Sequence, residues 1–521
     1  MAPTETPAAS TLKSKISKEL RAKANDFLNS KVKSKNLEEI IHYLDNAIKK
    51  KDALTPALLT LEVVFTQLLK RKEMFVGGGN AKQPLESEAE TKYRDWLRER
   101  YEETWNLMLS AIENCEKSQD SSQALISCMK LLAAEGKYPI NVDEEPLHFP
   151  RKRLRSIIEK VLTEKRSIQP LLSSFKEFSE YLDIVQNSWF ILSSMVKKSM
   201  TQNENVALNC LHLLNAIPLN KAVQDNAKLF VPLTEDAPET EKFEYSTTRK
   251  HINRIWNNIM TWLEPNLGEA IHRQMLIVLL ECVLSHLEKP VLLTDFLMDS
   301  LDCGGPVSLL ALQGVFTLIQ KHNITYPNVY EKLYSMFEPD IFHTKYKARL
   351  FYLADIFLSS THLPENLVAA FVKRLARLSL IAPPQDTVIM LQFIGNLLLR
   401  HLGLKRLICA TQALEVSTDP YQMHERDPVK SNAIDSSLWE IVALQKHAIP
   451  SVATAARFIA QPLPKLEWDL SEILEVKEED IFEQEITTKK SKQQQYALAF
   501  EKPETLFLPK NDQLQRHWSL I

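Results

Sequence analysis

Glycine is scarce in this chain, which has 521 residues and only 10 glycines. Average usage of roughly 7% would give about 36. Three of the glycines are consecutive, at positions 77–79, so few tight turns with positive φ are available elsewhere. The shortage excludes hairpin-rich β folds and nucleotide folds that depend on glycine loops.

The usual signatures of hydrolases and metalloenzymes are also missing. The sequence has no HExxH, GxSxG or CxxC motif, and its 6 cysteines and 13 histidines are dispersed. Scattered cysteines are typical of reduced thiols in the cytosol or nucleus. We therefore expect a protein that is not an enzyme and that requires no cofactor and no metal, with an enzyme of an unfamiliar type as the alternative.

The charges nearly balance, with 63 Lys and Arg against 66 Asp and Glu. A chain of this kind does not bind nucleic acid with its whole surface, so any RNA contact requires a local basic patch. The opening residues lack the apolar run of a secretory signal. They are instead basic up to position 35, which predicts an exposed N-terminal helix or arm over 1–35.

Apolar residues recur at helical spacing along most of the chain, which predicts an all-α fold. Helices of 12 to 20 residues joined by short Pro or Asp segments favour an α-solenoid of stacked HEAT/armadillo-like helical pairs, and a globular helical bundle is the alternative. We expect a helical repeat region over 36–245, a second helical domain over 246–460 and an irregular tail over 461–521. Before the dense apolar block at 296–401, helices are predicted over 36–49, 53–74, 87–117, 121–135, 149–164, 168–182, 183–200, 203–216, 246–263 and 266–287.

The apolar run from Cys303 to Gln320 contains no charge. It barely reaches the length of a membrane-spanning helix and includes several polar residues and glycines. A helix that is apolar on all sides is usually interior, so we interpret the run as a buried core helix. The alternative is a membrane protein of the nuclear envelope.

Basic residues suggest two candidate RNA contacts. Lys373, Arg374 and Arg377 share one face of a helix that begins near Leu367, and they are predicted to form a phosphate-binding surface. The alternative is an ordinary solvated helix face. The same surface is expected to include Lys345, Lys347 and Arg349. A run at 150–155, Pro-Arg-Lys-Arg-Leu-Arg, is a second candidate, for nuclear import or for rRNA.

Two Asp-Pro pairs mark the densest carboxylate cluster. Asp419, Glu425 and Asp427 could ligate Mg²⁺, but an aspartate followed by proline is the pattern of a helix cap and first turn, which we favour.

After Asp427 and Pro428, apolar residues repeat at helical spacing from 434 to 444, and Trp439 lies one position off that stripe. We expect four residues of this region to dock a protein partner, with a core role for Trp439 as the alternative. They are Tyr421, Asp427, Pro428 and Trp439.

The apolar block carries a more specific pattern than helical periodicity. Its elements include Ser308–Leu312, Tyr326-Pro327, Phe342-His343, Leu353-Ala354-Asp355, Ala382-Pro383-Pro384 and Ser436–Glu440. With these elements the region between about 300 and 445 resembles the CCAAT-binding-factor-type family of nucleolar complex proteins, and the resemblance extends more thinly over the N-terminal half.

The resemblance implies a function that composition alone does not show. It implies a non-enzymatic ribosome biogenesis factor of the nucleus and nucleolus, acting in the small-subunit processome on 18S pre-rRNA processing and on small ribosomal subunit assembly and export. The implied partners are a nucleolar protein 14-like protein and other processome proteins. The alternative is a cytoplasmic HEAT-type adaptor or transport receptor.

Overall fold

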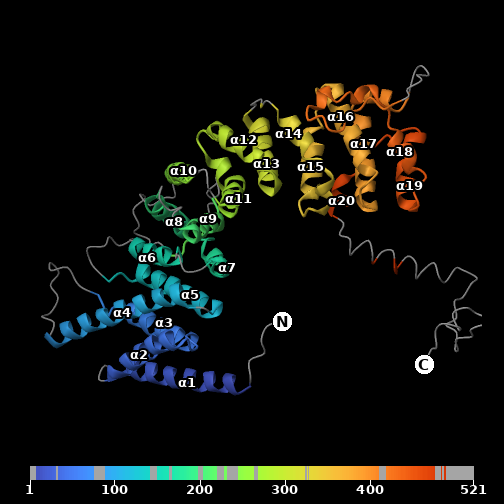
Figure 1. Ribbon diagram of the computed structural model, residues 1–521. Coiled ribbons are helices and arrows are strands. Elements are labelled where there is room, and N and C mark those ends of the chain that lie inside the picture. Colours follow the sequence, from blue (N-terminus) through green and yellow to red (C-terminus); the bar gives the residue numbers. More distant parts are fainter. Residues whose placement is uncertain are drawn as a thin grey trace, which may run out of the picture. The chain divides into compact units, whose positions relative to one another are not determined.

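The structure is a computed structural model that describes residues 7–30, 33–75, 88–115, 117–140, 149–162, 167–197, 203–219, 228–231, 245–262, 268–322, 326, 328–409, 418–475, 483 and 486–487. Within these ranges the chain is helical and contains no strand. The chain divides into two compact units, Met1–Thr325 and Tyr326–Ile521 (Figure 1). The predicted all-α class is confirmed. The glycine loop at 77–79 lies outside the described residues.

The helices of unit 1 begin and end within a few residues of most predicted positions. They are α1 (Pro7–Asn29), α2 (Lys35–Lys50), α3 (Thr55–Lys70), α4 (Glu88–Asn114), α5 (Ser118–Lys137), α6 (Arg151–Val161), α7 (Gln169–Phe178), α8 (Leu182–Met195), α9 (Glu204–Ala216), α10 (Tyr245–Met260), α11 (Glu269–Val278), α12 (Thr294–Asp302) and α13 (Gly305–His322). A π-helical turn at Leu279–Val283 and a 3₁₀ turn at Leu284–His286 extend α11.

Unit 1 is a solenoid of two helical layers. In one layer α3, α5, α7, α9, α11 and α13 pack in succession, and in the other α2, α4, α6, α8 and α10 do the same (Figure 1). Helices consecutive in sequence, such as α4 and α5, pack across the layers. Each helix pair can bury its apolar residues only against the next pair, which is how solenoids acquire a continuous core.

The apolar stripe of α3 shows how the sequence produces this packing. Leu58, Leu61, Phe65 and Leu68 follow one another at spacings of three and four residues, and all are buried.

The basic N-terminal helix is packed as well. Leu20, Ala24 and Phe27 of α1 are buried, and α1 contacts α2 and α3. The prediction of an exposed arm is therefore wrong for this face of the helix.

The uncharged run at 303–320 forms most of α13, and most apolar residues of this helix are buried, with α11 and α12 packed against it. Gly304, just before α13, and Gly305, its first residue, have φ of +75° and +58°, the left-handed conformation that glycine adopts without strain. Among the described residues, no helix has the length and apolar character to cross a membrane.

Unit 2 contains shorter helices and more 3₁₀ turns. Its helices are α14 (Val329–Ser335), α15 (Lys347–Phe357), α16 (Glu365–Ser379), α17 (Pro384–Arg400), α18 (Trp439–Leu444), α19 (Pro450–Ala456) and α20 (Leu470–Glu475). The 3₁₀ turns are Pro339–His343, Leu402–Leu407, Pro428–Lys430, Ala433–Asp435 and Arg457–Ala460. The single helical stripe predicted over 434–444 is therefore divided between a 3₁₀ turn and α18.

The first part of the predicted tail packs on α17. The side-chain amide of Asn396 pairs with the backbone of Trp468, accepting from its N–H and donating to its carbonyl, both at 2.9 Å. The Trp468 ring lies 5.7 Å from that of Phe458. These contacts bring α20 against α15 and α17.

Candidate interaction sites

Lys373 of α16 is buried rather than exposed. Its side chain has 0% exposure, and its Nζ lies 2.9 Å from Asp419 Oδ2 and 2.7 Å from Glu440 Oε1. It also donates to the carbonyl of Ser437 at 2.6 Å. A buried lysine requires such partners because an unpaired charge in the interior is costly. The ammonium therefore holds the segment 418–440 against α16.

Arg374 makes a second link of the same kind. Its Nε donates to the carbonyl of Phe337 at 2.7 Å, its Nη1 donates to that of Met423 at 3.2 Å, and its guanidinium lies 4.4 Å from the ring centre of Tyr334. The expected exposed basic face is therefore not what the structure shows for Lys373 and Arg374, because the chain after position 418 covers it. The ammonium of Lys373 is engaged by three protein acceptors, and Arg374 is buried against two carbonyls and a tyrosine ring, which leaves both unsuited to phosphate contact.

Arg377 lies at the edge of this cluster, with a side chain that is 29% exposed. It pairs with Asp419 at 2.6 Å and with Glu440 at 2.9 Å. Burial works against the charged form of Asp419, but hydrogen bonds from Ser436, Trp439 and Lys373 hold its pKa well below the usual range. For Glu440, burial outweighs the nearby cations and raises the pKa.

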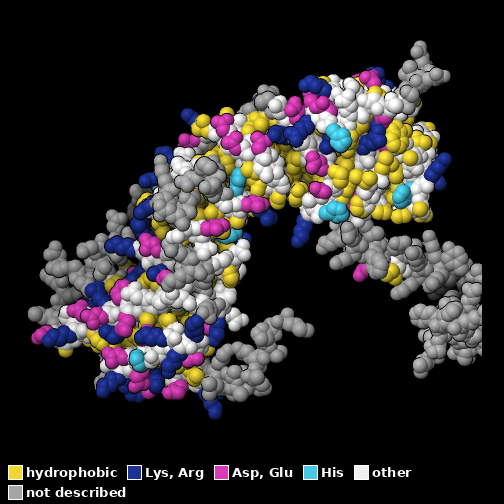
Figure 2. Space-filling view, viewed as in Figure 1, with side chains coloured by type: hydrophobic (Ala, Val, Ile, Leu, Met, Phe, Trp, Pro, Cys, Tyr) yellow, Lys and Arg dark blue, Asp and Glu magenta, His cyan; other side chains and the backbone are white. Residues whose placement is uncertain are grey.

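Trp439 remains at the surface, with 40% of the residue exposed. Its indole N–H donates to Asp419 Oδ2 at 2.9 Å, and the guanidinium of Arg377 lies 4.7 Å from its ring centre. These contacts fix the orientation of the indole while leaving part of it accessible. Val442, one turn further along α18, is also exposed. Figure 2 shows apolar side chains over the part of unit 2 that carries α17, α18 and α19.

The other residues proposed for partner docking have structural roles. Tyr421 is buried, and its hydroxyl lies 2.7 Å from that of Tyr334. Asp427 accepts from the backbone N–H of Val429 at 3.0 Å, which confirms the predicted cap, and Pro428 is buried in the 3₁₀ turn that follows. The described residues contain no group of three or more His, Cys, Asp or Glu arranged to hold a metal.

The remaining basic candidates lie at or just before the start of α15. Lys345 and Arg349 are exposed, whereas Lys347 is partly buried and pairs with the buried carboxylate of Asp386 at 3.0 Å. Lys345 and Arg349 thus differ from Lys373 in being exposed to solvent. An RNA contact at these two residues stays a prediction.

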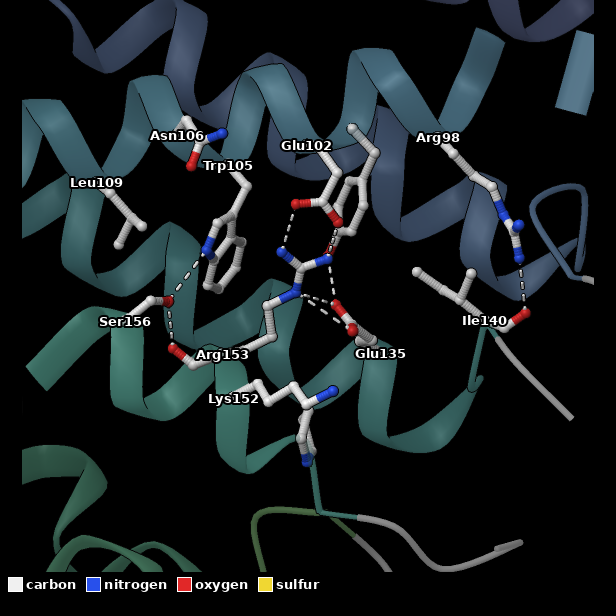
Figure 3. Close-up of a pocket in the computed structure, with 12 residues that line it drawn as sticks. Arg98, Glu102, Trp105, Asn106, Leu109, Glu135, Ile140, Lys152, Arg153 and Ser156 are labelled. Carbon is white, nitrogen blue, oxygen red and sulfur yellow. Dashed lines mark hydrogen bonds and ion pairs between the residues drawn. The ribbon is translucent and has the colours of Figure 1, made fainter. Parts of the chain in front are cut away.

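Unit 1 contains a pocket of about 490 Å³ between α4, α5 and α6 that the sequence did not indicate. Arg153 reaches into it between two glutamates (Figure 3). Its Nη1 and Nη2 donate to Glu102 at 2.9 and 2.5 Å, and its Nε donates to Glu135 at 3.0 Å. The guanidinium also lies over the rings of Tyr101 and Trp105.

Burial shifts the pKa of two acidic groups in this pocket. It raises the pKa of Glu135 despite the opposing effect of Arg153, and it raises the pKa of Tyr101, whose hydroxyl donates to Glu135 at 2.9 Å. Because every nitrogen of the guanidinium donates to a carboxylate, the arginine fastens three helices together and its charge is balanced within the pocket. The sequence of the basic run at 150–155 does not reveal that Arg153, unlike the other basic residues of the run, has a largely buried side chain paired with glutamates.

Helical pairs stacked in two layers define unit 1 as part of a helical-repeat protein. Residues 308–456 match the model of the CBF/Mak21 family, and residues 13–204 match the model described as nucleolar complex protein 4-like, TPR repeats. The second description names TPR repeats, whereas the sequence suggested HEAT/armadillo-like pairs. Both are stacked helical pairs.

Known proteins that are similar to this chain over most of its length identify the family more closely than the two partial matches. The chain is 37% identical to nucleolar complex protein 4 homolog A of Xenopus laevis over 91% of both chains. It is 35% identical to the homolog of Danio rerio over 96% of both, and 35% identical to that of Homo sapiens over 84% of this chain and 86% of the relative. The chain belongs to the nucleolar complex protein 4 family. The resemblance is thus confirmed, and the predicted nucleolar location agrees with the relatives' name.

Proposed function

We propose that this chain is a non-enzymatic assembly factor of the small ribosomal subunit. It would act in the small-subunit processome, support 18S pre-rRNA processing and subunit export, and hold a nucleolar protein 14-like partner. The observation that supports this proposal most strongly is similarity to relatives named for the nucleolar complex over nine-tenths of the chain. A two-layer solenoid supports it further, because stacked helical pairs present extended surfaces for binding other proteins.

Depleting the protein in cells tests the proposed process. We expect 18S rRNA to fall and its unprocessed precursors to accumulate, while large-subunit rRNAs change much less. RNA blots with probes for both subunits measure this. Equal loss of both subunits contradicts a specific role in the small subunit, and a cytoplasmic location of a tagged copy supports the adaptor alternative.

Partner docking is proposed at Trp439 and the exposed part of α18. The indole is large and accessible, and its orientation is fixed by Asp419 and Arg377, so little conformational entropy is lost when a partner covers it. Tyr421 and Pro428 are left out of the surface because they are buried.

Trp439→Ala is the test of this surface. We expect pull-down of the partner to weaken, because removing an interface anchor of this kind typically costs about 2 kcal/mol or more of binding energy. Phe190→Ala in unit 1 is a matched control, since its ring is exposed to a similar degree. A Trp439→Ala protein that binds the partner normally, or that loses binding only because it melts, counts against docking at this site.

A further inference from the structure

An exposed aromatic side chain lies between an arginine and a histidine on the α6, α8 and α10 layer of unit 1. Phe190 of α8 is 45% exposed, which is unusual for a phenylalanine in a helix most of whose other large apolar residues are buried. The guanidinium of Arg151, at the start of α6, lies 5.3 Å from its ring centre. On α10, the ring of His251 meets it edge to face at 5.3 Å.

The position of Arg151 is fixed by one side chain. Its Nε donates to Asn187 Oδ1 at 2.6 Å, and Asn187 is buried one turn before Phe190. Among the described residues no carboxylate pairs with Arg151, so its two terminal nitrogens are available. This differs from Arg153, two residues later, whose three guanidinium nitrogens all donate to glutamates.

Among the described residues, helices α6, α8 and α10 carry exposed cations around Phe190 and few unpaired carboxylates. The exposed residues Lys250 and Arg254 of α10 form no ion pair within the described part of the chain. Helix α10 contains no Asp or Glu at all. The one acidic residue of α8, Asp183, accepts from the backbone N–H groups of residues 230 and 231. Glu159 of α6 pairs with Arg155.

We propose that this surface, formed by Phe190, Arg151, His251, Lys250 and Arg254, binds single-stranded RNA. A nucleotide supplies both groups that the surface lacks: a phosphate for the unpaired cations and a base for stacking against the ring or the guanidinium plane. The carboxylates of an acidic peptide would pair with the cations, but they offer no planar aromatic group to stack on the phenylalanine ring. The proposal is independent of Trp439 and assigns RNA contact to unit 1 instead of α16.

Fluorescence anisotropy with the purified full-length chain and a labelled mixed-sequence 12-nucleotide RNA tests the proposal. Phe190→Ala should weaken binding roughly 5- to 150-fold, the effect of losing one stacked base. Phe190→Trp, which keeps a stacking surface, should bind at least as tightly as the wild type. The double variant Lys250→Gln/Arg254→Gln should make the dependence of log K on log salt shallower by about 1.4, since each lost phosphate contact removes about 0.7.

Three results overturn the proposal: unchanged affinity in Phe190→Ala, equal binding of an abasic 12-mer, or a 12-residue polyglutamate that competes as well as RNA and shows the same sensitivity to Phe190→Ala. Melting curves by circular dichroism confirm that each variant folds. Trp439→Ala serves as the reciprocal control and should bind RNA normally. Loss of RNA binding in Phe190→Ala with normal partner pull-down therefore separates this inference from the proposed docking surface.

Discussion

Replacing Lys373 by methionine should destabilise unit 2 rather than impair RNA binding. The side chain is fully buried between Asp419 and Glu440, at 2.9 and 2.7 Å. Removing one partner of a buried ion pair costs about 3–5 kcal/mol because the remaining charge is left uncompensated. Arg377 still contacts both carboxylates, so we expect the lower end of this range, about 3 kcal/mol. For a unit of this size the melting temperature should fall by about 6–12 °C.

Scanning calorimetry of the full-length protein measures this loss. Lys345→Met is the matched control, because Lys345 is an exposed lysine of the same unit, and it should melt like the wild type. The double variant Lys373→Met/Glu440→Gln should recover part of the stability, since it removes a buried carboxylate that has lost its partner. A shift in Lys373→Met below about 2 °C, typical of a surface substitution, would refute the assignment of Lys373 to the core.

Three further changes test other parts of the structure. Arg153→Met should lower the free energy of unfolding by about 3 kcal/mol, because its two glutamate partners lose their cation, and an unchanged urea midpoint would contradict this. Gly395→Ala should detach the segment around Trp468, since the new Cβ would lie 2.4 Å from its ring, and limited proteolysis should then cut near residue 468 faster than in the wild type. The pKa of Asp419 is lowered in the folded protein, so its contribution is fully present above about pH 4 and is lost as the pH falls through the folded pKa. The stability difference between wild type and Asp419→Asn in urea titrations should therefore shrink below pH 4, and a constant difference would count against the assignment.

Helix positions were predictable because the signal is local. A stripe such as Leu58, Leu61 and Phe65 requires only the 3.6-residue period to be recognised, and the observed α3 follows it. The cap at Asp427 was predictable for the same reason, since its acceptor and its donor at Val429 are two residues apart. The resemblance around 300–445 identified the family without any three-dimensional information.

The roles of charged residues were not predictable in this way. The sequence shows that Lys373, Arg374 and Arg377 share a face, but Asp419, which lies more than 40 residues away, decides that this face is interior. Likewise, Arg151 and Arg153 occur in one short basic run, yet one faces an exposed phenylalanine and the other two glutamates. The sequence by itself determined the helical class, most helix ends and the family. Only the tertiary structure decided which cations are buried with partners and which remain available, because burial depends on segments that are distant in the chain.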